Sequence, residues 1–194
     1  MPDAERSIRI LNNITDLLRN HRKDIEPAEG LIFRALSQAQ RDMMDTVKIL
    51  RIKYELPLHF NQTNYRLHSF VGEITNLQFS REALNPEIEL PQTSPSGRRD
   101  IIVHEAEDIE AGDWMEIECF MRCRKEDKID YDIDPIVPDE WDHLLEELVL
   151  SGYRTVNKEF RSRDEVMRDI RAKRSDVLGI DGVSVYRPGN RISW

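Results

Sequence analysis

Residues 130–145 decide the fold of this chain, because three patterns follow one another within them. They read Asp130-Tyr131-Asp132-Ile133-Asp134-Pro135-Ile136-Val137-Pro138-Asp139-Glu140-Trp141-Asp142-His143-Leu144-Leu145. Apolar and acidic residues first alternate, which is the period of a half-buried β-strand. Two prolines then bound a turn. The amphipathic pattern that begins near Asp139 predicts a long helix to about residue 160, with acidic side chains at its positive end.

Two further helices are predicted near the start of the chain. Residues 4–20 carry apolar side chains about one turn apart, and Pro27 separates them from a second amphipathic pattern over 28–50. The buried stripe of the second helix includes Leu36, Met43 and Val47. We expect the later helix to pack on this stripe, through Trp141, Leu144, Leu145 and Leu148. Gly152 lies inside that helix, where either a close helix crossing or a tolerated defect would explain a glycine.

Between these helices the apolar period changes from 3.6 to 2, which predicts an antiparallel sheet. Alternation covers residues 52–60, 65–71 and 115–123, with a short strand at 101–103. A turn at 125–128 would lead into the strand over 129–133. The expected fold class is α+β, with a helical bundle (4–50 and 138–174) and a β-region (51–135) in one domain over 1–175. An extended tail follows over 176–194.

The net charge of −9 is unevenly distributed along the 194 residues. Residues 100–147 hold 18 acidic and 4 basic side chains, a net charge of −14, whereas the remainder carries +5. Such a segment repels nucleic-acid phosphates. The plain interpretation is a solvated acidic surface. The residues expected to face outer water, or the channel that the family resemblance given below implies, are Glu105, Glu107, Asp108, Glu110, Glu116 and Glu118.

Motifs that carry catalytic chemistry are absent from the sequence. It contains no phosphate-binding loop, dinucleotide fingerprint, zinc-protease helix or nucleophile elbow. His104 stands among acids on adjacent positions, which rarely converge on a cation. Cys119 and Cys123 would lie roughly 13 Å apart on one predicted strand, too far to bridge, and read as free thiols of a reducing compartment. We therefore expect no enzyme activity, cofactor or metal.

A basic stretch between residues 161 and 174 follows the long helix. Ser162 and Glu165 have the spacing of a capping box, at which the helix would break and restart. The basic side chains could contact phosphates, but interleaved acids and the lack of an aromatic stacking platform favour an ion-paired subunit interface. The residues expected at this interface are Arg161, Arg163, Arg168, Arg171 and Arg174.

Two stretches resemble the head-to-tail adaptor proteins of tailed bacteriophages, which include the tail tubular A-type and podovirus head-completion adaptors. The first is Leu31–Leu50, with Ala35, Gln38, Ala39, Gln40 and Arg41, and the second is Tyr131–Tyr153. The likeness covers about residues 28–175 and is loose over 61–112. It implies a virion protein of the neck, made in the host cytoplasm. There it forms a ring of twelve subunits under the portal, extends the DNA channel and offers a platform for tail proteins, with no catalytic residues.

The alternative from another class is a cytoplasmic regulatory module that binds protein or nucleic acid through its basic helices. An enzyme ranks third. No membrane contact is expected, because no apolar run approaches about 18 residues, and the first residues lack the apolar core of a signal peptide.

Residues 176–194 form an apolar, glycine-rich tail that either folds back on its own subunit or docks on a partner. The resemblance favours docking on the portal, with ordering on assembly. Alternation of Val183 and Val185 suggests an added strand or clip. The residues expected to dock are Val183, Val185, Tyr186, Arg187, Ile192 and Trp194.

Overall fold

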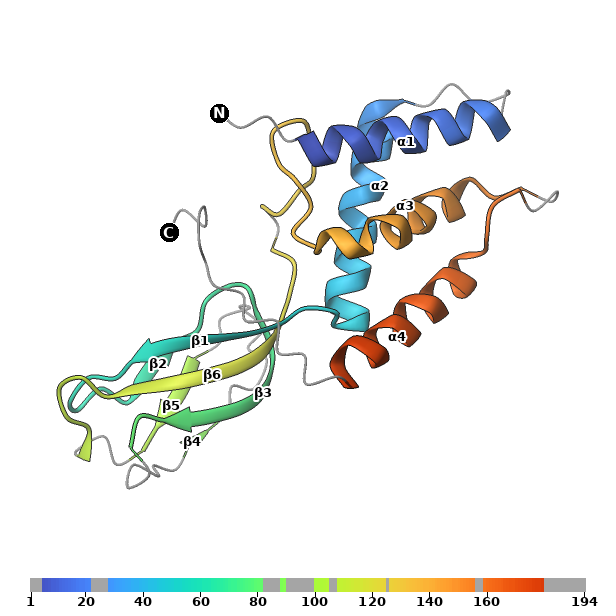
Figure 1. Ribbon diagram of the computed structural model, residues 1–194. Coiled ribbons are helices and arrows are strands. Elements are labelled where there is room, and N and C mark those ends of the chain that lie inside the picture. The colour runs from blue at the N-terminus through green and yellow to red at the C-terminus, as the bar shows by residue number, and fades with distance from the viewer. Residues whose placement is uncertain are drawn as a thin grey trace. The chain divides into compact units, whose positions relative to one another are not determined.

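The computed structural model describes residues 5–21, 28–81, 88–89, 100–104, 108–124, 126–155 and 159–179. These residues form two compact units. The helical unit is built from the chain before residue 51 and after residue 121, and the β unit from the chain between them. Helices and small antiparallel sheets are both present (Figure 1), so the predicted α+β class is confirmed.

The helical unit contains α1 (Glu5–His21), α2 (Glu29–Arg41), α3 (Asp142–Leu150) and α4 (Arg163–Gly179). α2 crosses α1 and α3, and α4 packs against α3 (Figure 1). The two N-terminal helices begin and end within about three residues of the predicted bounds. The second finishes as a π-helical turn, Asp42–Val47, which Lys48 closes in a left-handed conformation at φ 61°.

Side chains of α1 and α2 bind the backbone of residues 127–137, which we call the connecting segment. Gln40 is 1% exposed, and its amide donates to the Asp127 carbonyl at 3.2 Å while its oxygen accepts from the Ile136 N–H at 2.7 Å. The Ser37 hydroxyl accepts from the Ile129 N–H at 3.0 Å. The Ser7 hydroxyl donates to the Asp130 carbonyl at 2.8 Å. The N–H and carbonyl groups of the connecting segment that these side chains bind therefore have hydrogen-bond partners without pairing as a β-strand.

Arg6 fastens the end of the connecting segment to the start of α3. Its guanidinium donates to the carbonyls of Pro135 and Val137 at 3.0 and 2.6 Å and to the Asp142 carboxylate through Nε at 3.0 Å. It also pairs with Asp139 at 2.9 Å. Only 14% of the Arg6 side chain and 13% of that of Asp142 are exposed. The Arg6 guanidinium is therefore shielded from water, and its contacts join α1, the connecting segment and the start of α3.

The strand predicted over 129–133 does not form, and the last strand ends at Met121. Local hydrogen bonds explain the difference, because the Asp127 and Asp130 carboxylates accept from the backbone N–H groups of Arg124 and Asp132 at 2.8 and 2.9 Å. Aspartate bonds of this kind compete with a ladder. The β-region expected over 51–135 is therefore shorter, and Cys123 lies outside the strand that holds Cys119.

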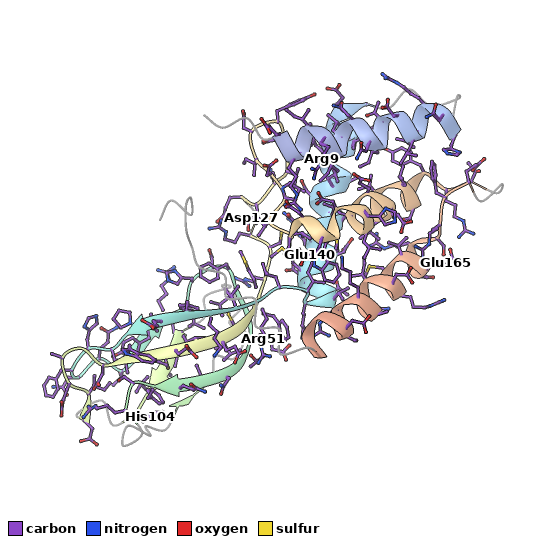
Figure 2. All side chains as sticks on the ribbon, in the orientation of Figure 1. Arg9, Arg51, His104, Asp127, Glu140 and Glu165 are labelled. Carbon is purple, nitrogen blue, oxygen red and sulfur yellow. The ribbon has the colours of Figure 1, made fainter. Side chains whose placement is uncertain are left out.

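The predicted long helix is also shorter than expected. After a 3-10 turn at Asp139–Trp141, α3 ends at Leu150, and a second 3-10 turn covers Ser151–Tyr153. Gly152 is exposed and a Cβ there would meet nothing within 4 Å, so the close helix crossing is wrong. The predicted restart at a capping box is confirmed, because the Ser162 N–H and hydroxyl both donate to Glu165 at 2.7 and 2.6 Å. Glu165 lies in the first turn of α4 (Figure 2). The break itself comes earlier than the predicted residue 161, since α3 ends at Leu150. α4 then continues three residues beyond the predicted loss of helix at Asp176.

The described residues of the β unit form two antiparallel sheets, each of three strands. One has the order β1-β6-β3, from Arg51–Pro57, Trp114–Met121 and Val71–Phe79. The other has the order β2-β5-β4, from Asn64–Arg66, Asp100–Val103 and Ile88–Glu89. The strand predicted over 65–71 is wrong, since β2 ends at Arg66 and β3 begins only at Val71.

The core of the helical unit lies where α2 and α3 pack against each other. Trp141, Leu145 and Leu148 are each 3% exposed or less, and so are the stripe residues Leu36, Met43 and Val47. Leu144, at 9% exposed, lies at the edge of the same core. These side chains are the ones expected from the sequence to be buried.

Leu145→Ala should lower the free energy of unfolding by about 2–5 kcal/mol, because it leaves a cavity at a fully buried position. Urea denaturation followed by circular dichroism measures the change. Leu17→Ala, on the partly exposed face of α1, is the control and should cost much less. A loss below about 0.5 kcal/mol in Leu145→Ala would show that the α3 face is not core.

Arg6→Ala should destabilise the protein by about 1.5–3 kcal/mol, because it leaves carbonyls and a carboxylate without their charged donor. Arg9→Ala is the matched control: Arg9 also pairs with Asp142, at 2.7 Å, but 59% of its side chain is exposed. An exposed pair contributes at most about 1 kcal/mol. Equal losses in the two variants would show that the buried contacts of Arg6 add nothing.

Candidate assembly surfaces

The expected acidic surface divides into exposed and buried parts. Asp108 and Glu110 are exposed. Glu116 is half-buried and pairs with Lys53 at 2.9 Å, a contact that raises the pKa of the lysine. Glu118 is only 5% exposed, so its expected place on a channel or outer surface is wrong. Glu105 and Glu107 lie outside the described residues.

Glu118 is buried because it forms part of a cross-strand charge pair. Its carboxylate approaches Nε of Arg51, which lies on β1 (Figure 2), to 2.6 Å, although the two atoms are not aligned for a hydrogen bond. Arg51 is opposite Phe120 in the register, so the contact with Glu118 is diagonal, as is that between Lys53 and Glu116. Two of the acids assigned to the surface therefore stabilise the pairing of β1 with β6.

Asp113, just before β6, is the most highly connected carboxylate of the β unit. Its oxygens accept from the guanidinium of Arg81 at 2.6 and 2.9 Å, from the Ser80 hydroxyl at 2.9 Å and from the Glu110 N–H at 2.8 Å. The hydrogen bonds from Arg81, then that from Glu110, hold the pKa of Asp113 down at about 2. No periodic pattern of residues marks Asp113 as a site, although Gly112, at φ +99°, indicates a turn.

A pocket of about 510 Å³ lies where β1 ends and β6 begins, and we call it the β1–β6 groove. Its main lining residues are Glu55, Pro57, His59, Phe60, Gly112 and Trp114. Pro57 and Trp114 are partners in the register, and Phe60 is 66% exposed. The groove therefore combines apolar side chains with an exposed carboxylate.

Three of the five arginines assigned to a subunit interface make contacts within the helical unit. Arg161 bonds Glu147 and Asp169 at 2.8 and 2.5 Å. Arg163 bonds Asp42 at 2.5 Å, and Arg174 donates to the Lys48 carbonyl at 3.1 Å. Their charge thus helps to hold α4 in place.

Arg168 and Arg171 are exposed on α4. Arg161 and Arg163, although ion-paired, also have 40% and 54% of their side chains exposed. The subunit interface on this face of α4 stays a prediction.

Large apolar side chains are exposed at several places. On the helical unit they include Leu31, at 56%, on α2, and Tyr131 and Ile133, at 49% and 41%, on the connecting segment. The Tyr131 ring packs edge-on against Phe33 with centroids 4.8 Å apart, and its hydroxyl bonds Glu29. Periodicity did not identify these residues as exposed, because it assigns apolar residues to a buried face.

Neither cysteine is arranged for chemistry. Both are free thiols, and burial raises the pKa of Cys119 to about 12 and that of Cys123 to about 11. Thiols with such pKa values remain protonated at neutral pH and react slowly. Within the described ranges, no cluster of three or more His, Cys, Asp or Glu side chains could hold a metal ion.

The docking residues assigned to the tail, Val183 to Trp194, lie outside the described residues. Of the helices that the structure describes, none is long and apolar enough to span a membrane. Neither a protein-family model nor a curated protein matches the chain.

Asp113→Asn should remove part of the acid sensitivity of the protein. The folded pKa of Asp113 is about 2, below the roughly 3.9 of an unfolded aspartate. The contribution of ionised Asp113 to the stability of the folded protein is therefore complete above about pH 4 and is lost as the pH falls toward 2. In urea denaturation from pH 5 to 2, the free energy of unfolding should decline less steeply for Asp113→Asn than for the unaltered protein. Asp108→Asn, at an exposed position, is the control. Identical slopes would contradict the assignment.

Proposed function

We propose that this protein is a structural subunit of the head-to-tail adaptor ring of a tailed bacteriophage. It would dock under the portal, extend the DNA channel and carry the tail proteins, with DNA passing through unbound. In this proposal the protein resides in the virion neck, and the helical bundle, antiparallel sheet and C-terminal tail are the parts of one adaptor subunit. Its activity is assembly and not catalysis.

Gln40 supplies the main support for this proposal. It belongs to the first of the two stretches that carry the resemblance. It binds the connecting segment at Asp127, before the second stretch, and at Ile136, within it. The two stretches thus form one structural unit, as expected if they are the signature of one fold. A resemblance between unconnected segments would carry much less weight.

Exposed apolar side chains within the same stretches give further support. Leu31 and Tyr131 are the first residues of the two stretches, and each is about half exposed to water. Exposed apolar area of this kind is typical of surfaces that become buried in an assembly. A ring of identical subunits uses head-to-tail interfaces that close on themselves.

The regulatory alternative depends on basic helices that are available to nucleic acid. Arg161, Arg163 and Arg174 are already bound within the helical unit, which leaves fewer cations for phosphates. Retention of the protein on DNA at physiological salt would nevertheless favour a regulator over an adaptor.

Ring formation is tested with the full chain and its cognate portal ring, with particle size measured by native mass spectrometry and electron microscopy. We expect a ring of about twelve subunits that joins the portal. Tyr131→Asp should raise the subunit concentration required for assembly at least tenfold, because it puts a charge into a buried interface. Leu17→Asp, outside the resembling stretches, is the matched control and should assemble normally.

A chain that stays monomeric with its portal at every concentration would overturn the proposal. If both variants lose assembly to the same extent, the effect of Tyr131→Asp is not specific and Tyr131 is not assigned to the interface. Unfolding curves of the two variants show whether either change acts through the fold.

A further inference from the structure

The β1–β6 groove has walls that are fixed before any ligand arrives. The Tyr65 hydroxyl bonds both the N–H and the carbonyl of His59, at 2.9 and 3.1 Å. On the opposite wall, the Asp113 carbonyl accepts from the Leu58 N–H at 2.9 Å, and its carboxylate is held by Arg81. A ligand therefore binds without having to order these loops, which lowers the cost of association.

The chemistry of the groove selects a ligand that is both apolar and basic. Pro57, Phe60 and Trp114 supply apolar and aromatic surface. Glu55 is exposed at the lining. Glu110 in the adjoining turn is also exposed, over 75% of its side chain, but it pairs with Arg81 at 3.2 Å, so Glu55 is the carboxylate that the proposal uses. Aromatic grooves bind extended, proline-containing peptides, and carboxylates beside them favour an arginine or lysine in the peptide.

A segment with this chemistry exists in the chain itself. Residues 182–194 read Gly182-Val183-Ser184-Val185-Tyr186-Arg187-Pro188-Gly189-Asn190-Arg191-Ile192-Ser193-Trp194, with two arginines and no acidic side chain. Fifteen residues follow the end of α4 at Gly179. Fully extended, they reach up to about 50 Å.

We propose that the C-terminal segment 182–194 of this protein binds in the β1–β6 groove. Pro188 and Tyr186 pack against Phe60 and Trp114, and Arg187 pairs with Glu55. This assignment goes beyond the adaptor function and is independent of it. It also differs from the portal docking that the resemblance implies for the tail, because it requires no portal protein.

Hydrogen exchange of the isolated full-length chain, followed by mass spectrometry, tests this proposal. Amides of residues 183–194 should exchange at least about tenfold more slowly than in a free peptide of the same sequence. Phe60→Ser should return them to the rate of the free peptide while the amides of β6 keep their protection, which shows that the β unit is still folded. Leu31→Ser is the matched control, at an apolar site on α2 that is 56% exposed against 66% for Phe60, and it should leave the tail protected.

Reversing the charges of Glu55 and Arg187 tests whether these two side chains pair. Glu55→Arg and Arg187→Glu should each speed exchange of the tail, and the double variant should restore slow exchange. Arg187→Glu lies in the tail, so it tests the contact without altering the folded strands. Tail amides that exchange at the free-peptide rate in the unaltered chain would overturn the proposal, and so would protection that Phe60→Ser and Glu55→Arg both leave unchanged.

Discussion

The helical unit depends on side chains that bind the backbone of the connecting segment. A chain that passes between helices without regular structure must satisfy its N–H and carbonyl groups elsewhere. Here Ser7, Ser37 and Gln40 provide those bonds, and the Arg6 guanidinium adds a charged clamp at the start of α3. The positions of α1, α2 and α3 are thus coupled through one irregular segment as well as through the apolar core.

Gln40 shows how a single side chain can join α2 to the connecting segment. Gln40 is a buried polar residue inside an otherwise apolar stripe, and such a residue is stable only when each of its groups has a partner. Its amide and its oxygen both bind the connecting segment. A sequence pattern that retains a glutamine there therefore describes a specific tertiary contact, and not merely helix formation.

Periodicity predicted the elements whose burial follows a regular repeat. The first two helices, β6 and the buried residues Trp141 and Leu145 follow directly from it. It failed where local bonds compete with regular structure, as in the acidic alternation of 129–133. The contacts of the acidic residues were harder still to predict. The burial of Glu118 depends on a diagonal partner on another strand, and the bonds of Asp113 come from two segments, the end of β3 and the turn before β6.

The interrupted course of the chain has a consequence for folding during synthesis. The described residues of the β unit all lie between Arg51 and Met121, and Arg51 and Phe120 are partners in the register, so its sheets can pair before the chain beyond residue 121 is made. The helical unit cannot, because Arg6 must wait for Asp142, 136 residues later. Until then α1 and α2 expose apolar stripes without their partner α3. The nascent chain is therefore most vulnerable to aggregation and proteases at its N-terminal end.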